Sequence, residues 1–564
     1  MRAMQTFSQK VTYDCIVVGS GAAGGWASQE LTAQGLNVLM LEAGSSIDPA
    51  KDFMSHKWPY ESDYRGRLSP AERRNFGAHV DEYTKHIFSP HSDHPYTTPE
   101  RRPYYWIRAR VLGGKTLVWG RGVPRFSDLN FKAKSRDGLG DDWPISYKDI
   151  EPHYDKVERS IGVAGEDIGV WHSPNNRFLK PFKLTCAEQL LRRGAGKLGR
   201  RVVQFPTAVL SEELGGRARC HFCSSHNCDR GCDSGAMFNS IYVTLPRARG
   251  TGRFTLRPDA IVREVTLNAE GKAKGVVFVD RLTKQTYEVT AKAVVLGASC
   301  LESTRILLNS RTAQFPTGLG NSSGLLGHYL HDHTMTGSIF GFAPELYNAK
   351  VINDDAKPCG FYIPRFRNVE GREKNFARGY QFSGGSGARM FPGFSKGLGE
   401  LFGTSLKREI HKLYPAVIGM TGFGECIARK ENRAQLDPEV LDPWGIPVLR
   451  ISASWSENEQ NMAKDIAATA EETFRAAGFE SLKVDQKISL PGESIHEVGT
   501  ARMGNDPKTS VLNPYGQSHD VKNLFVVDGS SFVSSGNQNV TLTILALCDR
   551  ACGFVAEQFR NGTI

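Results

Sequence analysis

Residues 13–44, YDCIVVGSGAAGGWASQELTAQGLNVLMLEAG, decide the fold of this 564-residue chain. The first six residues form a short apolar, β-branched run that predicts a buried strand, and a glycine-rich turn follows it directly. Residues 26–34 have a helical pattern that ends at a glycine. A second apolar run, 37–41, then ends at Glu42. The order strand, glycines, helix, strand and acid predicts a βαβ unit that binds a dinucleotide.

Three glycines and one acid carry this binding signal. Gly19 permits a tight turn, Gly21 lets the backbone approach a pyrophosphate, and Gly24 lets the helix pack closely on the strand. The helix N-terminus stabilises the phosphate charge, and Glu42 is placed to accept a hydrogen bond from a ribose hydroxyl. The alternative is a glycine-rich turn without a ligand, which the complete five-part order disfavours. The motif alone does not choose between FAD and NAD.

Composition limits the possible partners of the chain. It has 70 basic and 60 acidic residues, a net charge of +10, 40% hydrophobic residues and 23% charged residues, which is typical of a globular protein. Lysine and arginine are scattered, so we expect no nucleic-acid binding; a basic face for an acidic protein or an anionic membrane stays open. No apolar stretch reaches the ~18 residues of a membrane helix. Residues 1–12 lack a hydrophobic signal core.

Three further segments extend the nucleotide-binding signal. Residues 110–116 contain a pair of adjacent glycines, and residues 292–298 have a buried-strand pattern that ends in small residues. Residues 523–529 have a similar pattern, and an amphipathic helix is predicted from Thr541. A nucleotide-binding domain assembled from both chain ends favours a large flavoprotein over a compact dehydrogenase.

Together these segments resemble the glucose-methanol-choline (GMC) oxidoreductases, which bind FAD. Within that family the chain is most similar to bacterial sugar dehydrogenases with a cysteine cluster, including glucose, fructose, gluconate and glucoside 3-dehydrogenase catalytic subunits. The matching segments span nearly the whole chain: 19–44, 113–116, 142–144, 294–308, 324–333 and 496–547.

The resemblance implies an α/β fold, α+β overall, with a Rossmann-like FAD-binding domain interleaved with a substrate domain built on an antiparallel β-sheet. The FAD-binding domain is expected at 1–55, 106–130, 215–335 and 495–564. The substrate domain is expected at 131–214 and 336–494, and an insertion or lid loop at 56–105.

The same resemblance implies a catalytic pair, His496 and Asn539. The histidine would face the flavin and take the proton of the substrate hydroxyl, a role that suits a neutral imidazole. The asparagine would hydrogen-bond the same oxygen. The residues expected to contact the cofactor are Gly19, Gly21, Gly24, Glu42, Gly113, Gly114, Thr116, Val262, Asp528, Gly529, Asn539 and Thr541. The segment 331–333, HDH, has two alternating imidazoles, but it matches a structural segment of the family, and we expect no metal there.

Four of the 11 cysteines lie within thirteen positions, with the spacing C-x2-C-x4-C-x3-C: Cys220, Cys223, Cys228 and Cys232. Such a group can hold an iron–sulfur cluster or zinc, or form two disulfides. In the resembling dehydrogenases, cysteines hold a three-iron cluster that passes electrons from the flavin to a cytochrome. Cys228 and Cys232 match that spacing and the upstream pair does not, so ligation of either a 3Fe-4S or a 4Fe-4S cluster stays open.

The resemblance therefore implies FAD-dependent oxidation of a secondary hydroxyl of a sugar or glycoside to a ketone, as in glucoside 3-dehydrogenases. Electrons would leave through the iron–sulfur cluster to an external acceptor. The implied partners are a small subunit that carries an export signal and a cytochrome-type acceptor, which would place the protein in the periplasm; the alternative is the cytoplasm. Two other functions stay open: an oxygen-using pyranose or C-glycoside oxidase, and a noncatalytic FAD electron-transfer subunit.

Overall fold

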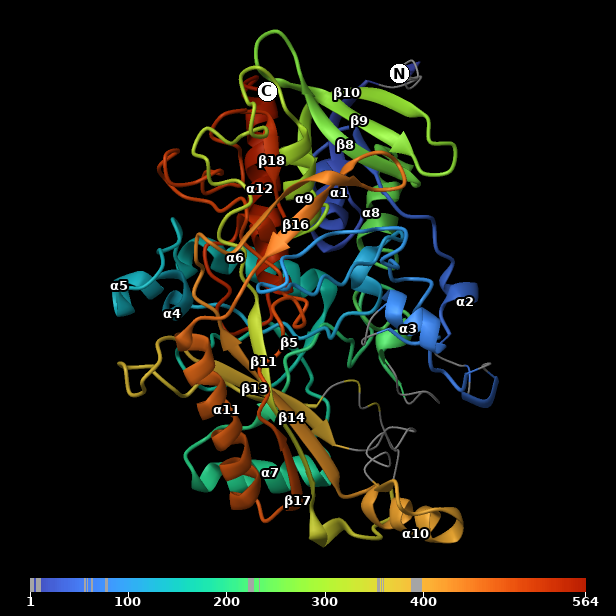
Figure 1. The fold of residues 1–564 in the computed structure, drawn as a ribbon, viewed down its shortest axis with the longest axis vertical. Coiled ribbons are helices and arrows are strands. Elements are labelled where there is room, and N and C mark those ends of the chain that lie inside the picture. The colour runs from blue at the N-terminus through green and yellow to red at the C-terminus, as the bar shows by residue number, and fades with distance from the viewer. Residues whose placement is uncertain are drawn as a thin grey trace.

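The computed structural model has two main β-sheets at opposite ends of the molecule (Figure 1), and its described residues also form two-stranded pairs of β15 with β16 (433–441 and 447–452) and of β4 with β5 (163–164 and 178–179). Both chain termini lie at the end that holds the larger sheet. The structure describes residues 5–6, 12–54, 57, 59–61, 64–76, 80–221, 228–232, 234–351, 356, 358, 360–386 and 398–564.

The larger sheet is centred on a strand that is almost entirely buried. Within the described residues the sheet comprises β1 (Gln5–Thr6), β2 (Tyr13–Val18), β3 (Val38–Leu41), β7 (Phe254–Arg257), β8 (Ala260–Leu267), β9 (Ala273–Asp280), β10 (Thr286–Leu296) and β18 (Leu524–Val526). The central strand β2 pairs in parallel with β3 and β10, and β18 pairs in parallel with β10. Strand β9 is antiparallel to both β8 and β10. A parallel core buried on both faces explains the continuous apolar runs of these strands.

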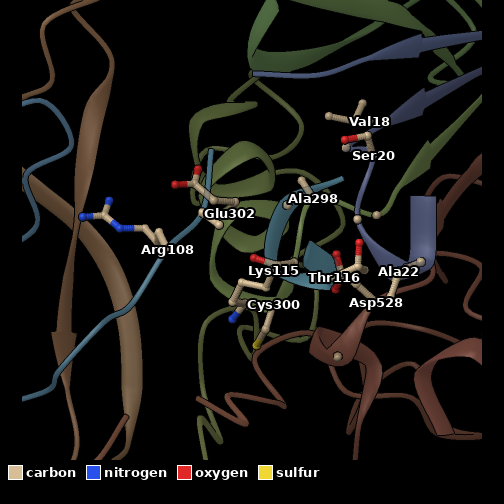
Figure 2. Close-up of a pocket in the computed structure, with 18 of the residues that line it drawn as sticks. Val18, Ser20, Ala22, Arg108, Lys115, Thr116, Ala298, Cys300, Glu302 and Asp528 are labelled. Atoms are coloured by element: carbon tan, nitrogen blue, oxygen red, sulfur yellow. The ribbon is translucent and has the colours of Figure 1, made fainter. Parts of the chain in front are cut away.

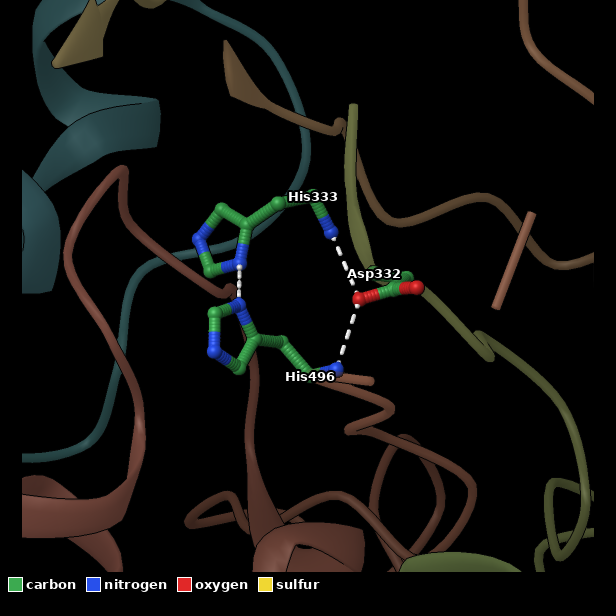
Figure 3. Close-up of side chains that lie close together, drawn as sticks. All are labelled: Asp332, His333 and His496. Atoms are coloured by element: carbon green, nitrogen blue, oxygen red, sulfur yellow. Dashed lines mark hydrogen bonds between the residues drawn. The ribbon is translucent and has the colours of Figure 1, made fainter. Parts of the chain in front are cut away.

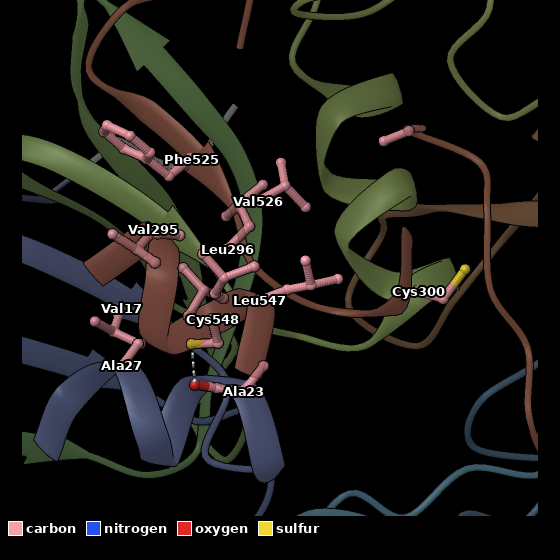
Figure 4. Packing of buried hydrophobic residues seen from close by; sticks show 14 of the residues in the cluster. Val17, Ala23, Ala27, Val295, Leu296, Cys300, Phe525, Val526, Leu547 and Cys548 are labelled. Carbon is pink, nitrogen blue, oxygen red and sulfur yellow. Dashed lines mark hydrogen bonds between the residues drawn. The ribbon is translucent and has the colours of Figure 1, made fainter. Parts of the chain in front are cut away.

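Two helices from opposite ends of the chain pack together on the larger sheet: α1 (Ala22–Ala33) and α12 (Thr541–Arg560). Ala23 and Ala27 are small enough to admit Leu547 and Cys548 beside them (Figure 4). The Cys548 thiol donates to the Ala23 carbonyl at 3.3 Å. This packing brings the start of α12 next to the glycine turn that precedes α1.

The predicted fold class is confirmed, with one shift in a helix boundary. The helix predicted over residues 26–34 begins at Ala22 in the structure. Its first turn is made of alanine and glycine, which carry no apolar periodicity, so the pattern becomes visible only at Trp26. The helix predicted from Thr541 is α12. The domain boundaries stay a prediction.

The smaller sheet is antiparallel throughout its described strands. These are β6 (Val203–Gln204), β11 (His333–Phe342), β12 (Phe361–Ile363), β13 (Tyr380–Ser386), β14 (Val417–Glu425) and β17 (Glu480–Asp485). Helices α7 (Cys186–Lys197) and α11 (Glu457–Ala476) cover one face, where Phe382, Ile418 and Met420 join the core. Since side chains alternate along a strand, Gln381, Thr421 and Phe423 lie on the opposite face.

Shorter elements connect and cover the two sheets. They are α2 (Pro49–Asp52), α3 (Pro70–Phe76), α4 (Asp128–Phe131), α5 (Ala133–Asp137), α6 (Tyr147–Ile161), α8 (Thr244–Gly250), α9 (Cys300–Asn309), α10 (Gly403–Leu413), β4 (Val163–Ala164), β5 (Phe178–Leu179), β15 (Arg433–Leu441) and β16 (Pro447–Ser452). In the predicted insertion 56–105, the described part packs on the body of the protein, where the Arg230 guanidinium lies 3.4 Å from the centre of the Tyr83 ring.

None of the helices in the described part of the chain is both long and apolar enough to span a lipid bilayer.

Candidate active site

A long cavity lies at the ends of the parallel strands of the larger sheet, where ligands bind in doubly wound folds (Figure 2). It contains about 1300 Å³ of space not filled by protein atoms, part of which is open to solvent. Its walls come from segments far apart in the sequence: 18–23, 41–43, 108–110, 114–116, 260–262, 297–302, 495–497, 528–529 and 540–541.

The glycine turn has the geometry that a pyrophosphate needs. Gly19 has φ +93°, and a Cβ there would lie 2.7 Å from the Gly297 carbonyl oxygen. A Cβ on Gly24 would lie 1.9 Å from the Gly19 carbonyl oxygen, so only glycine allows α1 to pack this closely on the turn. A Cβ on Gly21 would meet nothing within 4 Å, because that position faces the open cavity. The N-terminus of α1 has no side-chain cap and is suited to an anion. The turn therefore fits a dinucleotide.

Glu42 lies in the cavity wall near Val262, where a ribose would bind. Its carboxylate accepts hydrogen bonds from the Ser20 backbone N–H at 2.9 Å, the Ser20 hydroxyl at 2.6 Å and the Gly44 N–H at 2.7 Å. A carboxylate has about four acceptor positions, so one is left for a ligand hydroxyl. Burial raises the pKa of Glu42.

The loop that follows residues 108–110 forms a further part of the cavity wall. Gly113 has φ +91°, and its N–H donates to the Ser20 hydroxyl at 2.8 Å. The Thr116 hydroxyl donates to the Gly113 carbonyl at 2.6 Å. Gly113 therefore supports the loop from behind, while its neighbour Gly114 and Thr116 line the cavity.

Most of the residues predicted to contact the cofactor line this one cavity: Gly19, Gly21, Glu42, Gly114, Thr116, Val262, Asp528, Gly529 and Thr541. Gly24, Gly113 and Asn539 do not line it. Asp528 is held by the Ser530 N–H at 3.0 Å and the Ser530 hydroxyl at 2.7 Å, and burial raises its pKa. His496 also lines this cavity.

The ring of His496 meets a second histidine, His333 (Figure 3). Their Nδ1 atoms lie 3.0 Å apart, and Nε2 of His333 lies 2.9 Å from the Gly536 carbonyl oxygen. A carbonyl can only accept, so Nε2 of neutral His333 carries the proton and its Nδ1 is an acceptor. Nδ1 of His496 must then be the donor. This assignment from the hydrogen-bond partners leaves a lone pair on Nε2 of His496, 3.2 Å from Nδ2 of Asn539.

Asp332 joins the backbones of the two histidines by hydrogen bonds (Figure 3). Its Oδ1 accepts from the backbone N–H groups of His333 at 2.8 Å and His496 at 3.0 Å, and also from the Ser494 hydroxyl. Its Oδ2 accepts from the Gly492 N–H at 3.0 Å. Asp332, His333 and His496 have ligand atoms within 4.8 Å of one another, but these hydrogen bonds already use the atoms that a metal ion would need. Burial raises the pKa of Asp332 to about 6.

The site keeps both imidazoles neutral at pH 7. Burial lowers the pKa of His333 to about 4. Burial, with further contributions from nearby His333 and Lys115, holds the pKa of His496 well below its usual 6.5. Lys115 also lines the cavity and forms an ion pair with Glu497. A buried, neutral imidazole whose Nε2 is an acceptor, here paired only with the Asn539 amide, is suited to accept a proton once a substrate hydroxyl takes the place of that amide.

The sequence predicts His496 and Asn539 as a pair, and the structure places them 3.2 Å apart, but sequence reasoning missed four of their neighbours. Lys115 and Phe423 contact His496 through charge and ring packing, with the Phe423 ring centre 6.0 Å away. His333 was interpreted as part of a structural segment, and only its alternation with His331 signalled a shared face. Gln381 carried no signal, because a single glutamine in a strand is uninformative without its neighbours in space.

The structure describes three of the four clustered cysteines. Cys220, Cys228 and Cys232 share one apolar cluster with Leu210 and Met237. Cys223 lies outside the described residues. Within the described part of the chain, these cysteines do not make up a group with the spacing of metal ligands. The iron–sulfur cluster therefore stays a prediction.

Comparisons with known proteins agree with this geometry. The sequence profile described as GMC oxidoreductase matches residues 13–335 with its N-terminal part and 428–548 with its C-terminal part. The chain is 26% identical to the fructose dehydrogenase large subunit of Gluconobacter japonicus, over 98% of this chain and 100% of that protein. It is 29% identical to the 2-methyl-1,2-propanediol dehydrogenase of Mycolicibacterium austroafricanum, over 97% and 96%.

A solved structure shares the fold over almost the full length. The crystal structure of pyridoxine 4-oxidase from Mesorbium loti superposes with a TM-score of 0.63 and 15% sequence identity, covering 98% of this chain and 99% of that one. The two profile matches cover most of the chain, and the cavity fits the dinucleotide cofactor that the family uses. The chain belongs to the GMC oxidoreductase family and is an FAD-dependent enzyme that acts on CH–OH groups.

Proposed function

We propose that this enzyme oxidises a secondary hydroxyl of a sugar or glycoside to a ketone, with the 3-position of a glucoside as the first substrate to test. The observation that carries the proposal is the acceptor Nε2 of His496, which lines the cofactor cavity and accepts a hydrogen bond from the Asn539 amide that a substrate hydroxyl would replace. A polar face of the smaller sheet adjoins this pair, and it would receive the rest of the substrate.

The side chains supply the proton chemistry of such a reaction. Nε2 of His496 accepts the hydroxyl proton, and Nδ2 of Asn539 donates a hydrogen bond to the same oxygen. The hydrogen bond from Nδ1 of His496 to His333 keeps the imidazole in the tautomer that can act as a base. When FAD is bound, it supplies the acceptor for the hydride that leaves the carbinol carbon.

The face of the smaller sheet near His496 suits a polyhydroxylated ring. Strands β13 and β14 place Gln381 opposite Phe423, and Ser383 opposite Thr421. Ser383, Thr421 and Phe423 are partly exposed. Hydroxyl and amide groups beside an aromatic ring offer both hydrogen bonds and apolar contact to a sugar. The two relatives are named as a fructose dehydrogenase and a propanediol dehydrogenase, and both named substrates carry more than one hydroxyl.

The test of this function is an activity panel on purified holoenzyme with an artificial electron acceptor. Methyl β-D-glucopyranoside, D-fructose and 1,2-propanediol are the substrates, and mass spectrometry identifies the product. We expect a ketone of the glycoside, two hydrogens lighter than the substrate. A panel in which only 1,2-propanediol is oxidised would contradict a sugar or glycoside substrate.

We further propose that electrons leave through an iron–sulfur cluster held by Cys220, Cys223, Cys228 and Cys232 to a protein partner. The apolar cluster of the three described cysteines includes Met237 and adjoins Phe238 in the sequence. The Trp119 indole N–H donates to the Phe238 carbonyl at 3.0 Å, and Trp119 lines the cofactor cavity.

The partner we propose is a small subunit with a cytochrome-type acceptor. One relative is named as a large subunit, which supports an assembly of more than one chain. Export with such a subunit would place the enzyme in the periplasm. Cell fractionation that finds the enzyme only in the cytoplasm would overturn this location.

If the proposed iron–sulfur cluster is present, the purified protein contains iron. Enzyme purified anaerobically should contain iron and give an iron–sulfur EPR signal, and Cys228→Ser or Cys232→Ser should remove most of both while leaving FAD bound. Cys186→Ser is the matched control, because Cys186 is exposed and remote from the cysteine loop in sequence. Iron-free wild-type enzyme with rapid formation of hydrogen peroxide would instead identify an oxidase.

The lowered pKa of His496 predicts an unusual pH profile. The neutral imidazole is the active form, and it persists at every pH above the pKa. Because that pKa lies well below 6.5, the rate of flavin reduction by substrate should stay level from pH 8 through pH 6.5 and fall only in more acidic solution. Stopped-flow measurement across this range checks the profile. A half-maximal rate near pH 6.5 or above would contradict the neutral, buried base.

A further inference from the structure

We infer that Gln381 is a substrate-binding residue whose side-chain oxygen accepts a hydrogen bond from a second hydroxyl, on the carbon next to the one that is oxidised. The site would then select vicinal diols, such as the ring of a sugar, over simple alcohols. This inference rests on the proposed function and names the feature of the substrate that the site recognises.

The strand places Gln381 directly at the catalytic pair. Its neighbours Tyr380 and Phe382 on β13 belong to the core on the α11 side, so Gln381 lies on the opposite face. It pairs across the sheet with Phe423, whose ring packs beside His496. Although Gln381 is polar, only 1% of its surface is exposed.

The amide nitrogen of Gln381 is already used by the catalytic asparagine. Nε2 of Gln381 donates to Oδ1 of Asn539 at 3.3 Å, and Nδ2 of Asn539 faces Nε2 of His496 at 3.2 Å. Reversing the Gln381 amide would bring two acceptor oxygens together, and reversing both amides would aim an oxygen at the lone pair of His496. The Gly536 carbonyl therefore orients, in turn, His333, His496, Asn539 and Gln381.

This chain of donors leaves the side-chain oxygen of Gln381 without a partner. Oε1 is buried and has no hydrogen bond from any described residue. Buried polar atoms are nearly always paired, and leaving one unpaired destabilises the protein. An unpaired acceptor beside the catalytic pair can accept a hydrogen bond from a donor group of a bound substrate. The reacting oxygen lies between His496 and Asn539, so the hydroxyl that reaches Gln381 belongs to a neighbouring carbon.

Selectivity follows from the difference between the two kinds of substrate. A vicinal diol gives Oε1 of Gln381 a donor, whereas a simple alcohol buries Oε1 without one. A site built to bind a substrate hydroxyl rejects analogues that lack it. We expect wild-type enzyme to prefer the diol by about 10- to 100-fold, which is the range that follows from one unpaired buried group.

The experiment compares trans-1,2-cyclohexanediol with cyclohexanol as probes, using the second-order rate constant for anaerobic flavin reduction of the holoenzyme. Gln381→Met keeps the length of the side chain and removes the acceptor. It also releases Asn539, which lowers the rate for both probes, so the readout is the ratio of the two rate constants. Asn539→Asp is the matched control: it keeps the Oδ1 acceptor that orients Gln381 and removes the Nδ2 donor, so it should lower both rates and leave the ratio near its wild-type value. FAD absorbance and thermal melting check that the variants are folded.

Each outcome is decisive. A ratio that falls from about 10–100 to about 1 in Gln381→Met, and persists in Asn539→Asp, supports the inference. A ratio that Gln381→Met leaves unchanged, or a wild-type enzyme that does not prefer the diol, overturns the inference and leaves the proposed function intact. A wild-type enzyme that is reduced by none of the diol, methyl β-D-glucopyranoside and D-fructose overturns the proposed function itself, and the inference falls with it.

Discussion

Replacement of His496 by alanine is expected to slow flavin reduction by a sugar at pH 7 by about 10²- to 10⁴-fold, the usual contribution of a general base. The variant loses the one nitrogen that is positioned to accept the hydroxyl proton. It should still bind FAD, because the glycine turn and Glu42, which would hold the pyrophosphate and the ribose, are unchanged. Stopped-flow absorbance measures the rate, and the ratio of flavin to protein absorbance measures cofactor content.

Two comparisons make this test specific. His411 is exposed on α10, outside the cavity, and His411→Ala should keep the wild-type rate. Free imidazole added to His496→Ala should restore part of the rate, because it replaces the missing base. Imidazole would not restore the rate of a variant that had lost activity through misfolding. A rate in His496→Ala equal to that of wild type would rule out the assignment of the base.

The second large effect is expected at the glycine turn, where two glycines should fail in different ways. Gly24→Ala places a methyl group 1.9 Å from the Gly19 carbonyl oxygen, which forces the turn and α1 apart. Overpacking of this severity costs about 3 kcal/mol or more. Gly21→Ala places its methyl group in open space, where the pyrophosphate would lie. The first variant should be unstable without FAD, and the second should be stable but bind FAD poorly.

Thermal melting of the apoprotein and titration with FAD separate these effects. We expect the melting temperature of Gly24→Ala to lie well below that of wild type. The melting temperature of Gly21→Ala should equal that of wild type, while its affinity for FAD falls about 10- to 100-fold. Equal FAD affinity in Gly21→Ala and wild type would place the pyrophosphate elsewhere. An apoprotein of Gly24→Ala as stable as wild type would show that the turn can relax.

The cofactor site could be predicted from the sequence because its signal is contiguous. The strand, the turn and the helix at residues 13–33 follow one another along the chain, and each has a local physical cause in its apolar pattern or its glycines. The structure places Gly19 and Gly24 at close backbone contacts and Gly21 at the open cavity. These are three distinct reasons for glycine within one short motif.

The network around the base could not be predicted because its parts are distant in sequence. His333 begins β11, Gln381 lies in β13, and His496 lies in a loop of a third segment. The pairing of β11 and β13 with β14 brings His333 and Gln381 together, and the bridge between His331 and Val498 brings His496 beside them. A lone glutamine or histidine has no periodic signal, so its role depends on partners that the fold supplies.

Single-turnover flavin reduction shows whether His496 and FAD together oxidise a sugar hydroxyl. Holoenzyme is mixed anaerobically with methyl β-D-glucopyranoside, and the flavin absorbance band is followed with time. We expect the band to bleach in wild type with formation of one ketone per flavin, and to persist in His496→Ala with FAD still bound. A flavin that stays oxidised in wild type with this glycoside and with D-fructose would show that the enzyme does not oxidise sugars by this chemistry.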